Sequence, residues 1–101
     1  MPVNIEFKEN EMIAYISGEI DHHTAKSIRA VIDAGIESKK PQKVFLDFSG
    51  VTFMDSSGIG LVMGRYKVMQ NIGGSVIIAN PPSHIKKNMH IAGLDKIANI
   101  K

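Results

Sequence analysis

The chain has 101 residues, a formal net charge of +2 and no cysteine. Its length suits one compact domain over residues 1–101, and the lack of cysteine excludes disulfides, thiolate catalysis and thiolate metal sites. Scattered lysines, few aromatic residues and the absence of a long apolar run argue against a nucleic-acid-binding protein and a membrane helix, so we expect a cytoplasmic globular domain.

The N-terminal segment predicts a β-hairpin. Apolar and polar residues alternate over residues 3–8, as in an edge strand with one face in solvent. Residues 11–17 follow a short polar turn and are apolar on both faces, so the second strand should be more deeply buried than the first.

Two helices and two strands are predicted in the middle of the chain. The first helix should run from Asp21 to Lys39 with Asp21 as its N-terminal cap, and the second should run from about Ser57 to Asn71. The apolar segments 43–48 and 75–79 predict core strands. The apolar stripe of the second helix is predicted to comprise Ile59, Val62, Met63, Tyr66 and Met69.

Two glycines and one arginine in the second helix need their own interpretation. Glycine inside a helix lowers stability by up to about 1 kcal/mol, so we predict that Gly60 and Gly64 are flat positions where the helix lies close to the sheet. Arg65 is predicted to lie on the solvated face of the helix.

The last part of the chain predicts a third helix over residues 81–94, which begins at the prolines and ends at Gly93. Asn88 fits this helix poorly because it falls at the same spacing as Ile85 and Met89. The tail, residues 95–101, should either add a short strand or remain irregular.

The order of these elements predicts an α/β domain with a mixed sheet: an N-terminal antiparallel hairpin, then parallel strands, with the helices packed on the sheet. The loops that follow the parallel strands meet at one edge of such a sheet, where ligands and partners usually bind. The residues that we expect to be neighbours at this edge are Glu19, Asp21, Asp55, Ser56, Ser57 and Asn80.

The stretch FMDSSGIG, residues 53–60, does not fit the common enzyme motifs. A nucleophile elbow needs glycine two residues before its serine, where this chain has Met54 and Asp55. Neither a phosphate-binding loop of the Walker type nor a dinucleotide fingerprint is present. A hydrolase that uses Ser56 with a nearby histidine as its base remains a weaker alternative.

The same stretch is typical of a helix start. We predict that one serine caps the helix and that the other, Ser56, points outward. A phosphate at this position would meet free backbone amides and the positive end of the helix dipole, so phosphorylation would change the surface more than the fold.

Four sequence blocks resemble the anti-sigma factor antagonists, which carry a STAS domain, and most closely the members that act in sporulation. The blocks are GEIDHHTA (18–25), FMDSSGIG (53–60), GRYK (64–67) and AGLDKI (92–97). Together they extend the resemblance over nearly the whole chain.

The resemblance implies a phosphorylation-controlled switch that has no catalysis of its own. In the family, the serine at the position of Ser56 is phosphorylated by the anti-sigma factor, a kinase that uses ATP and magnesium, and a serine phosphatase reverses the step. The unphosphorylated form binds the kinase and releases the sigma factor. Asp21, Asp55, Ser57 and Gly58 would join Ser56 in the partner-binding surface, and Asp55 would either orient the Ser56 hydroxyl or cap the helix.

No cofactor, metal or direct nucleic-acid partner is expected. The adjacent His22 and His23 lack the acidic or cysteine partners of a metal site, and His84 and His90 are predicted to be surface residues. We expect a monomer. Family members often continue past the position of Lys101 into a further helix, and if that helix is missing here, the surface left exposed would favour oligomerisation or lower stability. The alternative function is that of a STAS subunit in another phosphorylation-controlled signalling assembly.

Overall fold

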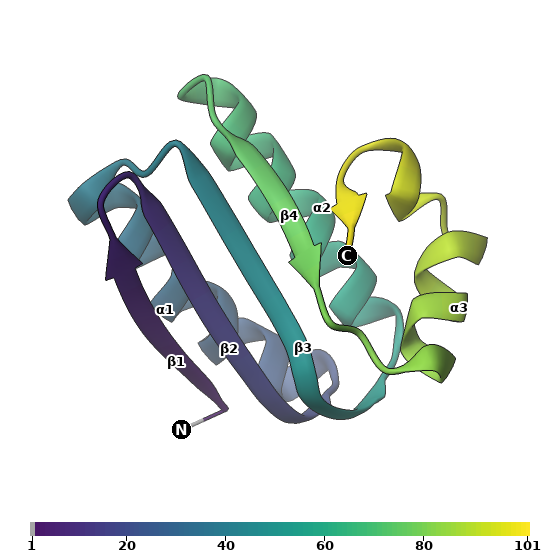
Figure 1. Cartoon of the computed structure of the whole chain (residues 1–101). Coiled ribbons are helices and arrows are strands. Elements are labelled where there is room, and N and C mark those ends of the chain that lie inside the picture. The colour runs from purple at the N-terminus through teal and green to yellow at the C-terminus, as the bar shows by residue number, and fades with distance from the viewer. Residues whose placement is uncertain (1) are drawn as a thin grey trace.

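Five strands form one sheet in the order β1-β2-β3-β4-β5 in the computed structural model, which describes residues 2–101 (Figure 1). The elements in chain order are β1 (Val3–Lys8), β2 (Glu11–Ile20), α1 (His22–Lys39), β3 (Lys43–Met54), α2 (Ser56–Asn71), β4 (Ser75–Ala79), α3 (Ser83–Ile91), the short 3₁₀ helix η1 (Leu94–Lys96) and β5 (Asn99–Ile100). Strand β1 is antiparallel to β2, and all other neighbours are parallel. The predicted mixed α/β sheet is confirmed.

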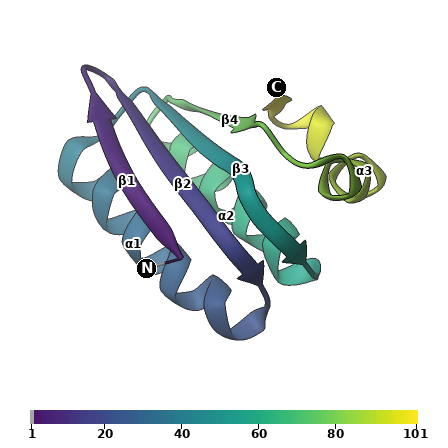
Figure 2. The same cartoon turned by 60° about the horizontal axis from the view of Figure 1, so that its bottom comes forward.

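Helices α1 and α2 cover one face of the sheet side by side, whereas α3 lies apart from them, on the β4 and β5 side of the sheet (Figure 2). Strands β2, β3 and β4 follow one another across the sheet, and right-handed crossovers in one direction place successive helices on the same face. The N-terminal ends of α1 and α2 therefore reach the same end of the sheet.

The core lies between this helical layer and the sheet. Helix α1 buries Ile28, Ile32 and Ile36, which follow one another at helical spacing along one face. Helix α2 is rotated relative to the prediction, because Leu61 is buried and Met63 is 46% exposed. The reason is that α2 has two covered sides, one against the sheet and one against α1, and a single-stripe pattern describes only the first.

The C-terminal segment resolves two uncertainties of the sequence. Asn88 is exposed while Ile85 and Met89 are fully buried, so the helix turns its polar residue to solvent and no conflict exists. Gly93, with φ of 81°, follows the end of α3 in the left-handed conformation that favours glycine. The tail then pairs with β4 as the short strand β5.

Strands β2 and β3 are longer than predicted and continue past the end of β4. Their pairing runs to Ile20 and Met54 after register shifts near Ser17 and Gly18, whereas β4 ends opposite Asp47. The added parts of both strands contain polar residues and a glycine, which interrupt the apolar pattern by which a strand is recognised in a sequence. Burial of Ile20 and Met54 nevertheless favours continued pairing.

The prediction that α2 approaches the sheet closely at Gly60 and Gly64 was wrong. A Cβ atom at Gly60 or Gly64 would meet nothing within 4 Å, so these residues do not lie against the sheet. The close approach occurs at Gly58, where a Cβ atom would overlap the side chain of Met54. The residue that needs to be glycine for packing is therefore in the first turn of α2.

Asn80 is bound to Asp47 on the neighbouring strand. Its Nδ2 donates to Asp47 Oδ2 at 2.9 Å, and Ser49 donates its backbone N–H and its hydroxyl to Asp47 Oδ1 at 2.9 and 2.6 Å. Burial by itself would raise the pKa of Asp47, but the hydrogen bonds from Ser49 and Asn80 outweigh it, so the pKa lies below its ordinary value. This network ties β3 to the residue that follows β4.

The two glycine positions give opposite predictions for stability. Gly58→Ala should lower the free energy of unfolding by about 1–3 kcal/mol, because Met54 has to move. Gly60→Ala should raise it by up to about 1 kcal/mol, because alanine favours the helix and has room. Urea denaturation of both variants beside the original chain measures these changes. A Gly58→Ala variant as stable as the original would contradict the packing described here.

The Asp47 network predicts a pH-dependent contribution to stability. The pKa of Asp47 is lowered in the folded state, so its ionised form stabilises the fold above the unfolded pKa, and this contribution is lost as the pH falls through the folded value. Asp47→Asn should therefore lower the free energy of unfolding at about pH 7 and cost much less at about pH 2. Denaturation at both pH values tests this, and an equal loss at both would show that the charge does not matter.

Candidate functional site

The start of α2 is organised by Asp55. This residue has extended backbone angles, and its Oδ1 accepts a hydrogen bond from the backbone N–H of Ser57 at 2.8 Å. The carboxylate therefore caps the helix, and the prediction that a serine does so was wrong. Both serines are instead the first two residues of the helix.

Ser56 is exposed, as predicted, whereas Ser57 is half-buried. Across the described residues 2–101, the Ser56 hydroxyl has no hydrogen-bond partner, and Asp55 makes its side-chain bond to Ser57 instead. Of the two roles left open for Asp55, capping is the one that the geometry shows. Gly58 follows as a buried residue in contact with Met54.

Asp21 caps the neighbouring helix α1 in the same way. Its Oδ1 accepts from the backbone N–H groups of His23 and Thr24, both at 2.9 Å, and Thr24 Oγ1 accepts in return from the backbone N–H of Asp21 at 2.9 Å. The hydrogen bond from the Thr24 amide is the largest effect on the pKa of Asp21 and holds it below the ordinary value. The sequence placed this cap correctly.

The two helix starts are joined by the backbone. Asp55 donates its N–H to the carbonyl oxygen of Ile20, the residue before Asp21, at 3.1 Å. Most of the predicted neighbours therefore do lie at one end of the sheet. We call the surface formed by Asp21, Asp55, Ser56, Ser57 and Gly58 the Ser56 surface. Asn80 does not belong to it, because its amide is bound to Asp47.

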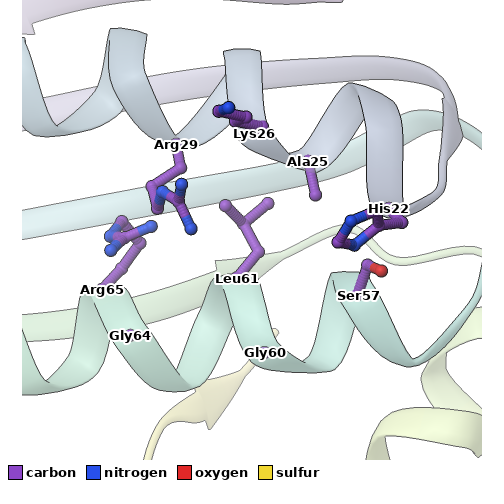
Figure 3. Close-up of a pocket in the computed structure, with 9 residues that line it drawn as sticks. All are labelled: His22, Ala25, Lys26, Arg29, Ser57, Gly60, Leu61, Gly64 and Arg65. Carbon is purple, nitrogen blue, oxygen red and sulfur yellow. The ribbon is translucent and has the colours of Figure 1, made fainter.

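A groove of about 350 Å³ runs along the contact between α1 and α2 and begins at this surface (Figure 3). Its lining includes His22, Arg29, Ser57, Gly60, Gly64 and Arg65. Arg65 is only 5% exposed, so the prediction of a solvated arginine was wrong. Sequence patterns did not reveal the groove, because it needs residues from two helices and the space above two glycines.

Histidines 22, 23, 84 and 90 are all exposed, and none of them is hydrogen-bonded to Ser56 or Ser57 in the part of the chain that the structure covers. Between residues 2 and 101, no three His, Asp or Glu side chains are grouped so as to hold a metal ion. Within the same range, no helix is long and apolar enough to cross a membrane.

Comparison with known proteins places this architecture in a family. The family model for the STAS domain matches residues 2–101. An anti-sigma F factor antagonist from Paenibacillus polymyxa is 34% identical over 102 residues, covering 99% of this chain and 86% of the relative. An anti-sigma-B factor antagonist from Bacillus subtilis strain 168 is 30% identical, covering 99% of this chain and 92% of the relative.

Solved structures agree with this match. The anti-sigma factor antagonist SpoIIAA in its unphosphorylated form superposes with a TM-score of 0.85 at 30% identity, covering 98% of this chain and 87% of the other. The phosphorylated form of the Bacillus cell fate determinant SpoIIAA gives a TM-score of 0.77 at 30% identity, with coverage of 98% and 90%. Sequence and fold thus lead to one conclusion, that this chain belongs to the STAS domain family.

Proposed function

We propose that this protein is an anti-sigma factor antagonist that is controlled by phosphorylation of Ser56. The unphosphorylated form binds an anti-sigma factor, which frees a sigma factor for transcription, and the phosphorylated form does not bind. The observation that carries the proposal is an exposed, unbonded serine as the first residue of α2, directly after a capping aspartate, in a chain similar to SpoIIAA.

The geometry around Ser56 supports phosphorylation without unfolding. Its hydroxyl holds no partner within residues 2–101, so modification breaks no hydrogen bond, and the first turn of a helix favours negative charge. A phosphate adds about 1.5 to 2 negative charges beside Asp55. The fold should therefore survive while the Ser56 surface becomes more negative and no longer fits a partner that accepts the bare hydroxyl.

The remaining residues of the Ser56 surface supply shape and fixed charge. Asp21 and Asp55 are both occupied as helix caps, which holds the two helix starts at a fixed separation through the Asp55 to Ile20 bond. Ser57 continues the surface along α2, and the buried Gly58 keeps the first turn close to Met54. We propose that the anti-sigma factor contacts Asp21, Asp55, Ser56 and Ser57, whereas the buried Gly58 acts by fixing the first turn of α2.

The partners follow from this scheme. We propose that the anti-sigma factor is also the kinase and transfers the γ-phosphoryl group of magnesium-bound ATP to Ser56 Oγ, with release of ADP and of the hydroxyl proton. A serine phosphatase returns the hydroxyl form. The protein itself contributes an acceptor and a binding surface rather than catalysis. Because sigma factors act on RNA polymerase, we place the switch in the cytoplasm, and the F-type relatives favour a role in sporulation.

Mass spectrometry tests the phosphorylated residue. The original chain, mixed with an anti-sigma kinase of the family and magnesium ATP, should gain one phosphoryl group, whereas Ser56→Ala should gain none. Ser57→Ala serves as the matched control, since it leaves the exposed hydroxyl in place and should still be modified. Full modification of Ser56→Ala would move the site to Ser57, and no modification of either chain by an active kinase would remove the proposed switch.

A binding experiment tests the effect of charge. Ser56→Asp should weaken binding to the anti-sigma factor by at least about tenfold, because it places a carboxylate where the partner accepts a hydroxyl. Ser83→Asp is a matched control, since Ser83 is likewise exposed and is the first residue of α3. Equal weakening by both substitutions, measured by calorimetry, would assign the effect to net charge alone and contradict the proposed surface.

A covalent probe tests the hydrolase alternative. A fluorophosphonate labels a serine that a base activates, and the free Ser56 hydroxyl has no such base within hydrogen-bond distance in residues 2–101. We expect no labelling of the folded chain under conditions that label a known serine hydrolase. Stoichiometric labelling that Ser56→Ala abolishes would establish an enzyme instead.

A further inference from the structure

The groove between α1 and α2 contains two glycines that the fold does not require. Gly60 and Gly64 are in the interior of α2, and a Cβ atom at either position would meet nothing within 4 Å. Each glycine lowers helix stability by up to about 1 kcal/mol relative to alanine. The absence of side chains keeps the groove open above them.

Arg65 lines the same groove and is incompletely paired. It is 5% exposed, and its Nε lies 2.9 Å from Asp33 Oδ1, which is the distance of an ion pair. Neither of these two atoms has a partner in hydrogen-bond geometry, and Arg65 Nη1 is buried with no partner among residues 2–101. A buried guanidinium with unused donors is costly, so Asp33 compensates this cation only in part.

Arg29 increases this imbalance from the opposite wall of the groove. Figure 3 shows the Arg29 side chain on α1 and the Arg65 side chain on α2 pointing towards one another. Arg29 has no carboxylate within 4.0 Å in the described chain. Burial is the largest effect that lowers the pKa of Arg65, Asp33 opposes it, and the charge of Arg29 lowers it further. The carboxylate of Asp33 thus pairs with Arg65 alone, and Arg29 adds a second positive charge that no carboxylate of the described residues offsets.

We propose that Arg29 and Arg65 form an oxyanion-binding site in this groove, which takes the phosphate or carboxylate group of a small molecule. An oxyanion between the two guanidinium groups accepts hydrogen bonds from both and removes their repulsion. Lys26 also lines the groove and adds a third positive charge. The two glycines leave the room that such a ligand needs beside α2.

This site is distinct from the phosphorylation site. Arg65 follows Ser57 by eight positions, which is about 12 Å along a helix axis. A phosphate on Ser56 therefore does not reach the arginines, and the inference holds whether or not the proposed switch is correct. The volume of about 350 Å³ also exceeds what one inorganic ion fills, which suits an oxyanion attached to a small organic group.

Nuclear magnetic resonance of the full chain provides the test. The Nε–Hε signals of the arginines are followed while inorganic phosphate is added at constant ionic strength, with acetate in a parallel titration and chloride as the reference. We expect saturable shifts of the Arg29 and Arg65 signals with phosphate or acetate and none with chloride. A stronger response to phosphate assigns a tetrahedral ligand group, and a stronger response to acetate assigns a carboxylate.

Variants distinguish a specific anion-binding site from a nonspecific effect of positive charge. Arg29→Gln should weaken anion binding by at least about tenfold. Lys67→Gln, which removes the same charge from an exposed position of α2 outside the groove, should leave it unchanged. Gly64→Leu keeps every charge but fills the groove, and it should also abolish the shifts while the spectrum remains that of a folded chain.

Three results would overturn the inference. These are shifts that increase linearly without saturation, equal binding by Arg29→Gln and the original chain, or equal weakening by Lys67→Gln. Each would mean that the arginines respond to ionic atmosphere rather than hold an anion.

Discussion

The extended pairing of β2 with β3 is the constraint on which the functional end of this protein depends. These strands continue past the end of β4, and the backbone bond from Asp55 to Ile20 closes the pair where both helices begin. Buried Ile20 and Met54 anchor this extension in the core. Because the two strands end together, Asp21 and Asp55 cap neighbouring helices, and Ser56 is presented beside both caps.

The same arrangement explains the uneven use of glycine in α2. Met54, the last residue of β3, lies under the first turn of the helix and leaves room only for glycine at position 58. Farther along the helix Leu61, Val62 and Met69 are buried, and Leu61 lines the groove between α2 and α1. Gly60 and Gly64 then face α1, where they hold open the groove that contains the two arginines.

Helix α2 therefore carries two electrostatically different sites, one at its start and one in its interior. At its start, a neutral serine hydroxyl lies beside a carboxylate and the positive end of the helix dipole. Two turns later, Arg65 is buried with too little negative charge around it. The start of the helix suits a switch whose charge is changed by a partner. The site at Arg65 suits a negatively charged ligand.

Much of this protein was determined by local pattern in the sequence. Alternation, helical stripes and the Asp21 cap depend on residues a few positions apart, so the mixed sheet, the three helices and the exposed Ser56 could be predicted from them. The four family blocks supplied the functional hypothesis. Only the tertiary structure decided which side of α2 meets α1, why Gly58 rather than Gly60 is packed tightly, why Arg65 is buried, and why Asn80 is bound to Asp47. Each of these depends on contacts between elements far apart in the chain, which no short-range periodicity records.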